Sequence, residues 1–455
     1  MEAHNICLIN DSFPPEIDGV ANAVTNYARI LNGFSNVSVL TPFHPEADDG
    51  AFDFPVLRYP SIELTGSLGY RAGVPLSAAL MQQVENAEFD LIHCHCPITS
   101  AILARMIRDR IDKPVVLTYH TKFDIDIANC IHGKLVQQEA VRLLAENISA
   151  CDEVWTVSRG AGENLRKIGY TGSYTVMPNG VDLPKGRLTD EQVYFATKDY
   201  ALPENVPVFL FVGRMMWYKG IRIILDALAE LHTKKQPFRM VFVGGGGDLD
   251  EIKTYTQALG LSGEVIFVPP EYDRERIRAW YCRADLFLFP STFDTNGLVV
   301  REAAACALAS VLVAGSCAAE DTEDGKSAFL IEQNAGSMAA LLLRLCKKPE
   351  AIRQVGENAQ TMLYLSWEDA VKNAYERYGL VMENYAAGVY PSHTRLSDGL
   401  FHATAQAMDD ISWVRSQIKT LLELDTARRL GRQERFTERY SRLREELREG
   451  LERFL

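Results

Sequence analysis

Short apolar runs rich in β-branched and aromatic residues alternate with longer amphipathic stretches along this chain, in two successive series. The runs of the first series are 5–10, 37–40, 56–60, 90–95, 115–120, 153–158 and 174–182. Those of the second series are 208–214, 239–247, 265–268, 286–291 and 311–315. Near-continuous apolar strands between helices are typical of parallel sheets covered on both faces. The sequence therefore predicts an α/β fold with two doubly wound domains in tandem.

The polar stretch 186–207 separates the two series and suggests where one domain ends. The predicted parts are a first domain over 1–190, a second over 191–365, a helix over 366–386 that crosses back onto the first domain, and a helical extension over 387–455. The extension carries an apolar stripe of Phe436, Tyr440, Leu443, Leu447, Leu451 and Phe454. Such a stripe fits a helix packed on its own protein, a self-association or partner helix, or a membrane-surface helix.

The charge and the cysteines limit the classes of function. A formal net charge of −13 gives little support to nucleic-acid binding. The nine cysteines are odd in number and scattered, which is typical of reduced thiols in a cytoplasm. No apolar stretch approaches the roughly 18 residues that span a bilayer, and no basic leader precedes the first strand. We therefore expect a cytoplasmic protein, with peripheral contact at the inner membrane left open.

The run LIHCHCP over 91–97 offers four metal-ligand side chains in a row. Alternate residues of a strand share a face, so His93 and His95 should point one way and Cys94 and Cys96 the other. Zinc sites normally draw ligands from two separated pairs, and no second pair with that spacing lies nearby. The run is therefore interpreted as a strand end whose histidine faces a cleft, and no metal site is predicted.

Polar residues follow the strand-like runs where a doubly wound sheet binds ligands, beyond the carboxyl ends of its strands. These residues are Asp11 to Gly19, His95, His120, Arg214, and Pro290 to Gly297. Arg214 and Lys219 lie on a strand-to-helix turn, and two cations beside a helix N-terminus suit a diphosphate. Two solvated surface cations are the alternative. The glycines at 244–247 would let backbone approach a ligand closely, although tight turns also use glycine.

The stretch FPSTFDTNGLVVREAAA over 289–305 is the most specific signal. Asp294 and Glu302 are eight residues apart, and a helix starting near Gly297 would place both carboxylates at one pocket. Carboxylates that bind sugar hydroxyls, next to amides that bind phosphate, describe a nucleotide-sugar site. A solvated helix start is the alternative interpretation.

With these motifs the chain resembles retaining glycosyltransferases of the GT-B fold, in glycosyltransferase family 4, over about residues 5–385. The matching elements are Asp294 with Glu302 for the family's Glu-x7-Glu, Gly213, Arg214, Lys219 and Gly220 for its GR…KG turn, Gly244 to Gly247 for its glycine-rich loop, and the segments PPEIDGVANAV and MPNGVD. Asp294 replaces the family's first Glu, and Asp248 replaces its usual proline. The stretch 118–135 and the opening loop resemble members that glucosylate diacylglycerol.

The resemblance implies a GT-B fold, in which two doubly wound, Rossmann-like domains face a cleft, and a role for each matching residue. The donor would contact Gly19, Arg214, Lys219, Gly245, Asp294, Thr295, Asn296, Gly297, Leu298 and Glu302. Arg214 and Lys219 would hold the diphosphate, Glu302 the ribose hydroxyls and Asp294 those of the transferred sugar. His120 would lie near the anomeric carbon, so the expected catalytic residues are His120, Arg214, Lys219 and Asp294. The acceptor side would include His95, Asp18, Lys122 and Asp124.

The implied activity is retaining, metal-independent transfer of a hexose from a nucleoside-diphosphate sugar to an acceptor hydroxyl with α linkage. UDP-glucose or a similar UDP-hexose is the expected donor, no cofactor is expected, and the acceptor (lipid, glycan or small molecule) is open. Three alternatives remain: a diacylglycerol α-glucosyltransferase at the membrane surface, a nucleotide-sugar epimerase of the same fold, and a non-catalytic nucleotide-sugar-binding accessory subunit. The expected partners include no nucleic acid. Self-association or membrane contact through the C-terminal helices stays open.

Overall fold

The computed structural model describes residues 3–16, 18–63, 71–74, 78–123, 127, 134–203, 205–295 and 297–390. Its first domain is built on a seven-stranded sheet in the order β3-β2-β1-β6-β7-β8-β9, and every neighbouring pair is parallel. The strands are β1 (Asn5–Ile9), β2 (Asn36–Pro42), β3 (Val56–Tyr59), β6 (Leu91–Cys94), β7 (Val115–Tyr119), β8 (Glu153–Thr156) and β9 (Thr175–Val176). Their apolar side chains are buried because helices cover both faces.

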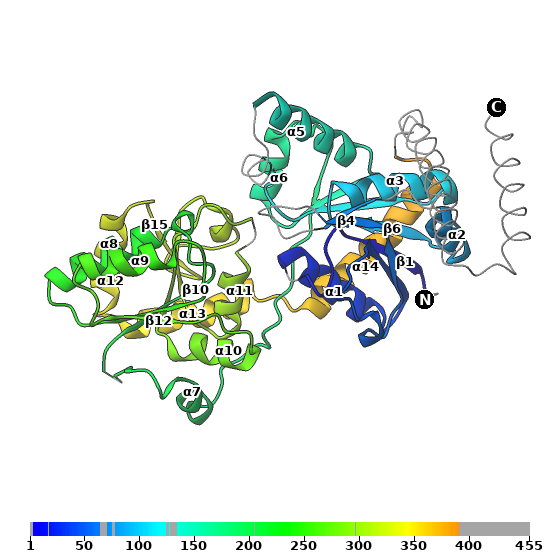
Figure 1. Cartoon of the computed structure of the whole chain (residues 1–455). Helices are drawn as coiled ribbons and strands as arrows, with labels where there is room; N and C mark the ends of the chain where they lie inside the picture. The colour runs from blue at the N-terminus through cyan, green and yellow to red at the C-terminus, as the bar shows by residue number, and fades with distance from the viewer. Residues whose placement is uncertain are drawn as a thin grey trace, which may run out of the picture.

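Helices and one hairpin connect these strands (Figure 1). They are α1 (Gly19–Leu31), the 3-10 turn η1 (Asp49–Ala51), the antiparallel hairpin of β4 (Ser61–Glu63) and β5 (Arg71–Gly73), α2 (Ala78–Asn86), α3 (Thr99–Ile111), α5 (Lys134–Ser149) and α6 (Arg159–Lys167). Asp18 caps α1 because its carboxylate accepts from the backbone N–H groups of Val20 and Ala21. Ser158 caps α6 in the same way through the N–H of Ala161.

The second domain repeats the design with a six-stranded parallel sheet in the order β12-β11-β10-β13-β14-β15. Its strands are β10 (Val208–Val212), β11 (Arg239–Val243), β12 (Val265–Val268), β13 (Leu286–Phe289), β14 (Ser310–Val313) and β15 (Phe329–Ile331). The helices are α7 (Asp190–Thr197), α8 (Ile221–Thr233), α9 (Leu249–Ala258), α10 (Arg274–Arg283), α11 (Leu298–Ala305), α12 (Ala335–Leu345) and α13 (Pro349–Leu363), with the short turns η2 (Trp217–Lys219) and η3 (Cys317–Ala319).

The strand order reverses once in each sheet, between β1 and β6 in the first and between β10 and β13 in the second. Ligands of doubly wound sheets bind at such a reversal, beyond the carboxyl ends of the two strands. The fold therefore points to the loops after β1 and β6 in the first domain and after β10 and β13 in the second.

The last described helix, α14 (Trp367–Ala386), packs on the first sheet rather than on the second domain that precedes it (Figure 1). Trp367, Val371 and Tyr378 join the apolar core formed by α1 and β1. The Tyr378 ring stacks on Trp155 at a centroid distance of 5.4 Å, and Arg377 pairs with Glu153 at 2.7 Å. The last part of the described chain thus ties the two domains together.

Most of the predicted runs coincide with strands, but short elements escaped prediction. The hairpin β4–β5 and strand β15 have three residues per strand, too few to show a period. The run predicted over 174–182 forms only the two-residue strand β9, because Pro178 to Gly180 leave the sheet. A Cβ on Gly180 would lie 2.4 Å from the Trp367 backbone, so this segment meets α14 closely instead.

The domain boundaries at 190, 365 and 386 stay predictions, and the predicted extension lies outside the described residues from 391 onward. Within the part of the chain that the structure describes, no helix is long and apolar enough to cross a bilayer.

Candidate active site

An ion pair between a buried lysine and a half-buried aspartate joins the loops after β10 and β13, at the strand-order reversal of the second sheet. Lys219 is 8% exposed, and its Nζ lies 2.5 Å from Asp294 Oδ1. The Ser291 hydroxyl donates to Asp294 Oδ2, also at 2.5 Å. The structure therefore brings together two of the predicted catalytic residues, and it adds Ser291, which sequence reasoning missed.

The surroundings of Lys219 favour a cation there. The rings of Tyr218 and Phe293 lie 5.7 and 5.9 Å from its Nζ, within the range of cation–π attraction. Arg214, at the start of the same turn, is exposed. The turn thus offers one sheltered and one solvated positive charge at the carboxyl end of β10.

The glycine-rich loop packs against this turn. A Cβ on Gly244 would lie 2.1 Å from the Gly213 carbonyl oxygen, and one on Gly246 would lie 2.5 Å from that of Met215. Both glycines are therefore needed for two backbone segments to touch, and Gly244 also has a φ of +142°. Gly245 accepts from the Met215 N–H at 2.8 Å. Asp248, the departure from the family's proline, accepts from the Trp217 N–H at 2.8 Å and so anchors the turn.

Glu302 has partners for both of its carboxylate oxygens. Arg274 donates to Oε1 at 2.7 Å and the Tyr281 hydroxyl donates to Oε2 at 2.9 Å. Burial, followed by the charge of Glu302, raises the pKa of Tyr281, which keeps this hydroxyl a donor. Arg274 also lies 3.6 Å from Asp182 of the segment between the domains. Sequence reasoning missed Arg274 and Tyr281, because their role depends on how α10 packs on α11.

Helix α11 begins beside Asp294. Gly297 holds a left-handed conformation with φ of +58°, and a Cβ there would lie 3.0 Å from that of Ala318. Leu298 is the first residue of α11, so its N–H is one of those without an intrahelical partner. Asn296, a predicted donor contact, lies outside the described residues.

Three buried histidines line the first sheet near its reversal point. His93 and His95 share a face, with ring centroids 3.9 Å apart, as the alternation predicted. His95 Nδ1 lies 3.0 Å from His120 Nε2, while His93 bonds Tyr378 and Thr118 at 2.5 and 2.7 Å. Burial lowers the pKa of His120 from its ordinary 6.5 to about 3, and it also lowers the pKa values of His93 and His95. These rings are neutral near pH 7.

The remaining first-domain residues lie on nearby loops. Gly19 is exposed at the first turn of α1, where the helix N-terminus is open. Both oxygens of Asp18 are occupied, by the α1 amides and by the Ser12 hydroxyl at 2.6 Å. Lys122 donates to the Thr292 carbonyl at 3.3 Å, and Asp124 lies outside the described residues. An acceptor role for Asp18 stays a prediction, since helix capping already explains it.

Direct hydrogen bonds join the two domains at the site. The Thr295 hydroxyl donates to the His120 carbonyl at 2.8 Å, and the Ser158 hydroxyl donates to the Thr295 carbonyl. Glu320 accepts from the first two backbone N–H groups of α6, those of Arg159 and Gly160, at 2.7 and 2.5 Å. The loop that carries Asp294 is thus fixed to the strand ends of the first domain.

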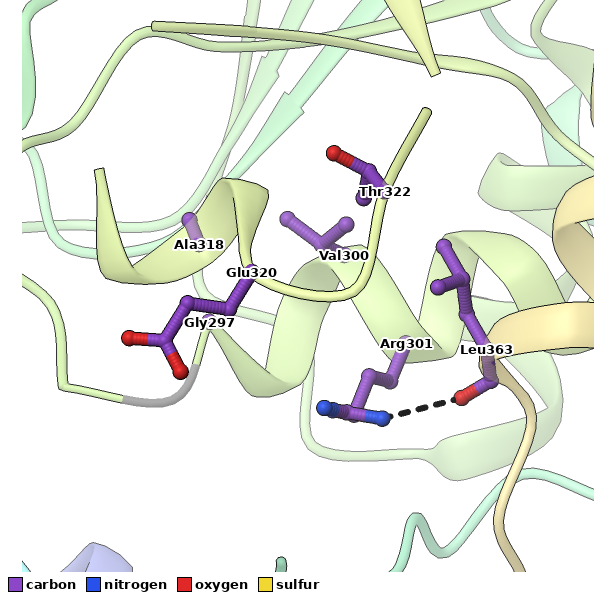
Figure 2. Close-up of a pocket in the computed structure, with 7 residues that line it drawn as sticks. All are labelled: Gly297, Val300, Arg301, Ala318, Glu320, Thr322 and Leu363. Carbon is purple, nitrogen blue, oxygen red and sulfur yellow. Dashed lines mark hydrogen bonds between the residues drawn. The ribbon is translucent and has the colours of Figure 1, made fainter. Parts of the chain in front are cut away.

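A small, partly open pocket lies at the start of α11 (Figure 2). It is lined by Gly297, Val300, Arg301, Ala318, Glu320, Thr322 and Leu363. Arg301 donates to the Leu363 carbonyl at 3.1 Å, while the Glu320 carboxylate points away from Val300 and Thr322.

Comparison with known proteins finds matching family models and related sequences. The model for Glycosyl transferases group 1 matches residues 195–362, and the model for Glycosyltransferase Family 4 matches residues 17–185. A D-inositol 3-phosphate glycosyltransferase of Catenulispora acidiphila is 30% identical, covering 65% of this chain and 71% of that protein. An alpha-monoglucosyldiacylglycerol synthase of Acholeplasma laidlawii is 24% identical, covering 78% and 91%.

Solved structures resemble the fold. Anabaena HepE in complex with UDP and glucose matches with a TM-score of 0.65 and 20% identity, over 82% of this chain and 99% of that one. A sucrose-phosphate synthase from Thermosynechococcus elongatus matches with a TM-score of 0.64 and 20% identity, over 84% and 99%. These likenesses confirm the predicted GT-B arrangement of two doubly wound domains.

Proposed function

Because this chain belongs to glycosyltransferase family 4, we propose that it transfers a hexose with retention from a nucleoside-diphosphate sugar to an acceptor hydroxyl. The family makes it a glycosyltransferase that uses nucleotide sugars. UDP-glucose or a similar UDP-hexose is the proposed donor, which the HepE structures with UDP and with UDP-glucose support. The proposed product linkage is α.

The Lys219–Asp294 pair at the reversal point is the observation that carries the proposal. Lys219 lies where the loops after the two central strands meet, and α11 begins a few residues beyond Asp294. A sheltered ammonium beside a helix N-terminus is suited to the β-phosphate of a bound donor. Before a donor binds, Asp294 neutralises Lys219. When the β-phosphate pairs with Lys219, the Asp294 oxygens become available to hydroxyls of the sugar.

In the proposed reaction, the bond between the anomeric carbon and the β-phosphate oxygen breaks while the acceptor oxygen bonds the same face. The departing nucleoside diphosphate takes the acceptor proton, so charge and atoms balance. Lys219 and Arg214 stabilise the negative charge that develops on the leaving group. No resident metal or cofactor is assigned a step, since the cations of the turn supply the positive charge.

The neutral histidines fit an oxocarbenium-like centre. A protonated His120 would repel the positive charge that builds on the sugar ring, and burial prevents that protonation. The Thr295 hydroxyl fixes the His120 carbonyl at the domain interface. We therefore assign His120 to the first-domain side of the sugar, as a neutral polar wall.

One alternative is weaker on physical grounds, and another is distinguished by experiment. An accessory subunit would not need a sheltered lysine paired with an aspartate, because burying a charge is unfavourable unless it is well partnered. An epimerase of the same fold would use a similar donor site, so analysis of the products distinguishes it. A lipid acceptor at a membrane surface remains compatible with the proposal, and the similarity to the alpha-monoglucosyldiacylglycerol synthase supports it.

A panel of UDP-, GDP- and ADP-sugars, incubated with the full chain without acceptor, tests the donor site. We expect release of nucleotide from one UDP-hexose, at a rate that falls at least about 100-fold in Lys219→Met. Lys234→Met, at an exposed lysine of the same domain, is the control and should keep the wild-type rate. Equal rates in both variants would contradict the proposed cradle. Proton NMR of the transfer product then shows whether the anomeric configuration is retained.

A further inference from the structure

The chain crosses between the two domains twice, and the two crossing segments pair with each other. The Val181 N–H donates to the Leu365 carbonyl at 3.0 Å, and Val181 forms an isolated parallel bridge with Ser366. This pairing places the crossing where one domain would turn against the other. Such a turn must break the contacts that other elements make across the interface.

One of these contacts lies at the first turn of α6, on the side of the first domain that faces the second (Figure 1). Glu320, which follows η3, accepts from the Arg159 N–H at 2.7 Å and from the Gly160 N–H at 2.5 Å. N–H groups at a helix start have no intrahelical partner, and the helix dipole favours a carboxylate beside them. The next N–H, that of Ala161, bonds Ser158 of its own domain. The second domain thus supplies two of the hydrogen bonds that cap a helix of the first.

The missing side chain at position 160 allows this contact. A Cβ on Gly160 would lie 2.3 Å from Cys317 Sγ and 2.8 Å from Glu320 Oε1. Both distances are shorter than a van der Waals contact, so an added methyl group would force these two side chains away. Because Glu320 Oε1 is the atom that accepts from the Gly160 N–H, its displacement would also break that hydrogen bond.

An ion pair beside this contact is more exposed. The Arg159 guanidinium donates to Asp321 Oδ1 at 2.7 Å, and the two side chains are 61% and 48% exposed. Solvent screens pairs of this kind, so they contribute little. We therefore assign the interdomain contact to Glu320 with the first turn of α6, and Asp321 offers a matched control.

Behind Glu320, η3 packs on the start of α11. A Cβ on Gly297 would lie 3.0 Å from that of Ala318 in η3, and both residues line the same pocket as Glu320 (Figure 2). Asp294 lies three residues before Gly297 in the loop that leads into α11. The position of η3 therefore bears on the position of this loop.

The first turn of α6 also touches this loop directly. Ser158, the residue that caps α6, donates to the Thr295 carbonyl, and the Thr295 hydroxyl donates to the His120 carbonyl at 2.8 Å. Thr295 adjoins Asp294 in the sequence. The start of α6 thus holds the second domain both before α11, at Thr295, and after β14, at Glu320.

We propose that Glu320 and Gly160 form an interdomain latch that holds the donor site in its closed arrangement, and that both are positioning residues for the transfer. This inference rests on the proposed transfer function and deepens it. With the latch formed, α6 holds η3 and the loop of Asp294 against the first domain. When the latch opens, Glu320 and the α6 amides bind water, and the domains separate so that the nucleotide can leave.

Hydrogen exchange of the full chain without ligand tests the latch itself. After correction for intrinsic rates, Glu320→Gln and Gly160→Ala should each raise the exchange rate at the start of α6 at least about 10-fold, because water then reaches these amides. Alanine in place of glycine would by itself strengthen a helix and slow exchange, so faster exchange in Gly160→Ala identifies the loss of the latch. Wild-type rates in both variants would overturn the proposal.

Two matched controls accompany these variants. Asp321→Asn removes the charge next to Glu320 but leaves the contact with α6. Gly379→Ala adds a methyl group to a glycine of α14 whose Cβ would have no atom within 4 Å. Both controls should keep wild-type exchange at the start of α6, and faster exchange in the controls as large as in the latch variants would contradict the assignment to Glu320 and Gly160.

Nucleotide release from the UDP-hexose found in the donor panel tests the positioning role. Each latch variant should raise the KM for the donor about 10-fold while kcat is retained, because a saturating donor closes the domains again. Glu320→Gln combined with Gly160→Ala should raise KM no further than either change alone, since each change removes the same latch. Effects that multiply would show two independent roles and contradict the latch.

The two measurements separate failure of the latch from failure of the transferase function. No nucleotide release by the wild-type chain from any donor would defeat the transferase function, while the exchange rates still show whether the latch exists. Release by the wild type, with an unchanged KM in both latch variants, would defeat the positioning role and leave the transferase function standing. Thermal unfolding checks that every variant is folded.

Discussion

The carboxyl edges of the two sheets differ in how their polar groups are satisfied. At the second sheet, Lys219 and Asp294 pair with each other, and Glu302 is held by Arg274 and Tyr281. At the first sheet, Thr41 Oγ1 and His95 Nε2 are buried without a hydrogen-bond partner among the described residues. Lys219, Asp294 and Glu302 are therefore held before a ligand binds, whereas Thr41 and His95 lack a partner, as does the Ser316 hydroxyl after β14 of the second sheet.

This difference has an energetic meaning. A donor that binds here must replace the contact between Lys219 and Asp294 with contacts of its own. A diphosphate is favoured because its charge gives strong hydrogen bonds to Lys219. An uncharged ligand can bind where it supplies hydrogen-bond partners to polar groups that have none, because leaving such groups unpaired is itself unfavourable. The contrast can be tested by changing residues on each edge and measuring the stability of the protein without ligand.

The largest expected effect is at the Lys219–Asp294 ion pair of the second sheet. Asp294→Asn should lower the free energy of unfolding by about 3 kcal/mol, because it leaves a buried Lys219 without its counter-charge. Combined with Lys219→Met, the loss should be smaller than the sum of the single losses, with a coupling of about 1–3 kcal/mol. Urea unfolding of the four proteins of this double-mutant cycle measures it.

The control for this cycle is an exposed pair in the same domain, Lys326 with Glu323 at 2.9 Å. The cycle of Lys326→Met and Glu323→Gln should give a coupling below about 0.5 kcal/mol, because solvent screens exposed charges. If the two couplings are alike, the Lys219–Asp294 pair is not sheltered in solution, and this site is not held in place before a donor binds.

The sequence could predict some residues of these sites but not others. Lys219 and Asp294 were predictable because each follows an apolar strand, and the ends of neighbouring parallel strands meet. The partners of Glu302 were not, since Arg274 and Tyr281 reach it only through the packing of α10 on α11. Glu320 was equally hidden, because its contact with α6 depends on how two separately folded domains face each other. Local patterns therefore predict strand ends, while contacts between helices and domains need the structure.

A second difference between the sheets is sensitivity to acid. His93, His95 and His120 are buried in the first domain, whereas the only histidine between 191 and 365 is His232, which is exposed. Burial lowers the pKa of His120 to about 3, so the unfolded chain binds a proton at a higher pH than the folded one. Stability from this histidine is complete above about pH 6.5 and is lost as the pH falls toward 3. At pH 5 one such histidine lowers the free energy of unfolding by about 2 kcal/mol relative to its value at neutral pH.

Hydrogen exchange followed by mass spectrometry at pH 7 and pH 5 distinguishes the two domains. After correction for the intrinsic exchange rate, protection should fall in β6 and β7 and persist in β10 and β11. Equal losses in both sheets would show that the histidines do not set the acid response. Greater protection of the first sheet at pH 5 would mean that these rings bind protons in the folded state.

The smallest expected effect concerns a single hydroxyl, and it has the opposite sign. Thr41 on β2 is fully buried, and its hydroxyl has no hydrogen-bond partner among the residues that the structure describes. Thr41→Val replaces it with a methyl group of the same shape, so the free energy of unfolding should rise by about 1 kcal/mol. Thr118→Val on β7 is the matched control. That hydroxyl bonds His93 at 2.7 Å, so its loss should destabilise the protein by about 1–2 kcal/mol. If both variants destabilise the protein alike, the Thr41 hydroxyl has a hydrogen-bond partner in solution, for instance a bound water molecule, and the first sheet is as completely hydrogen-bonded as the second.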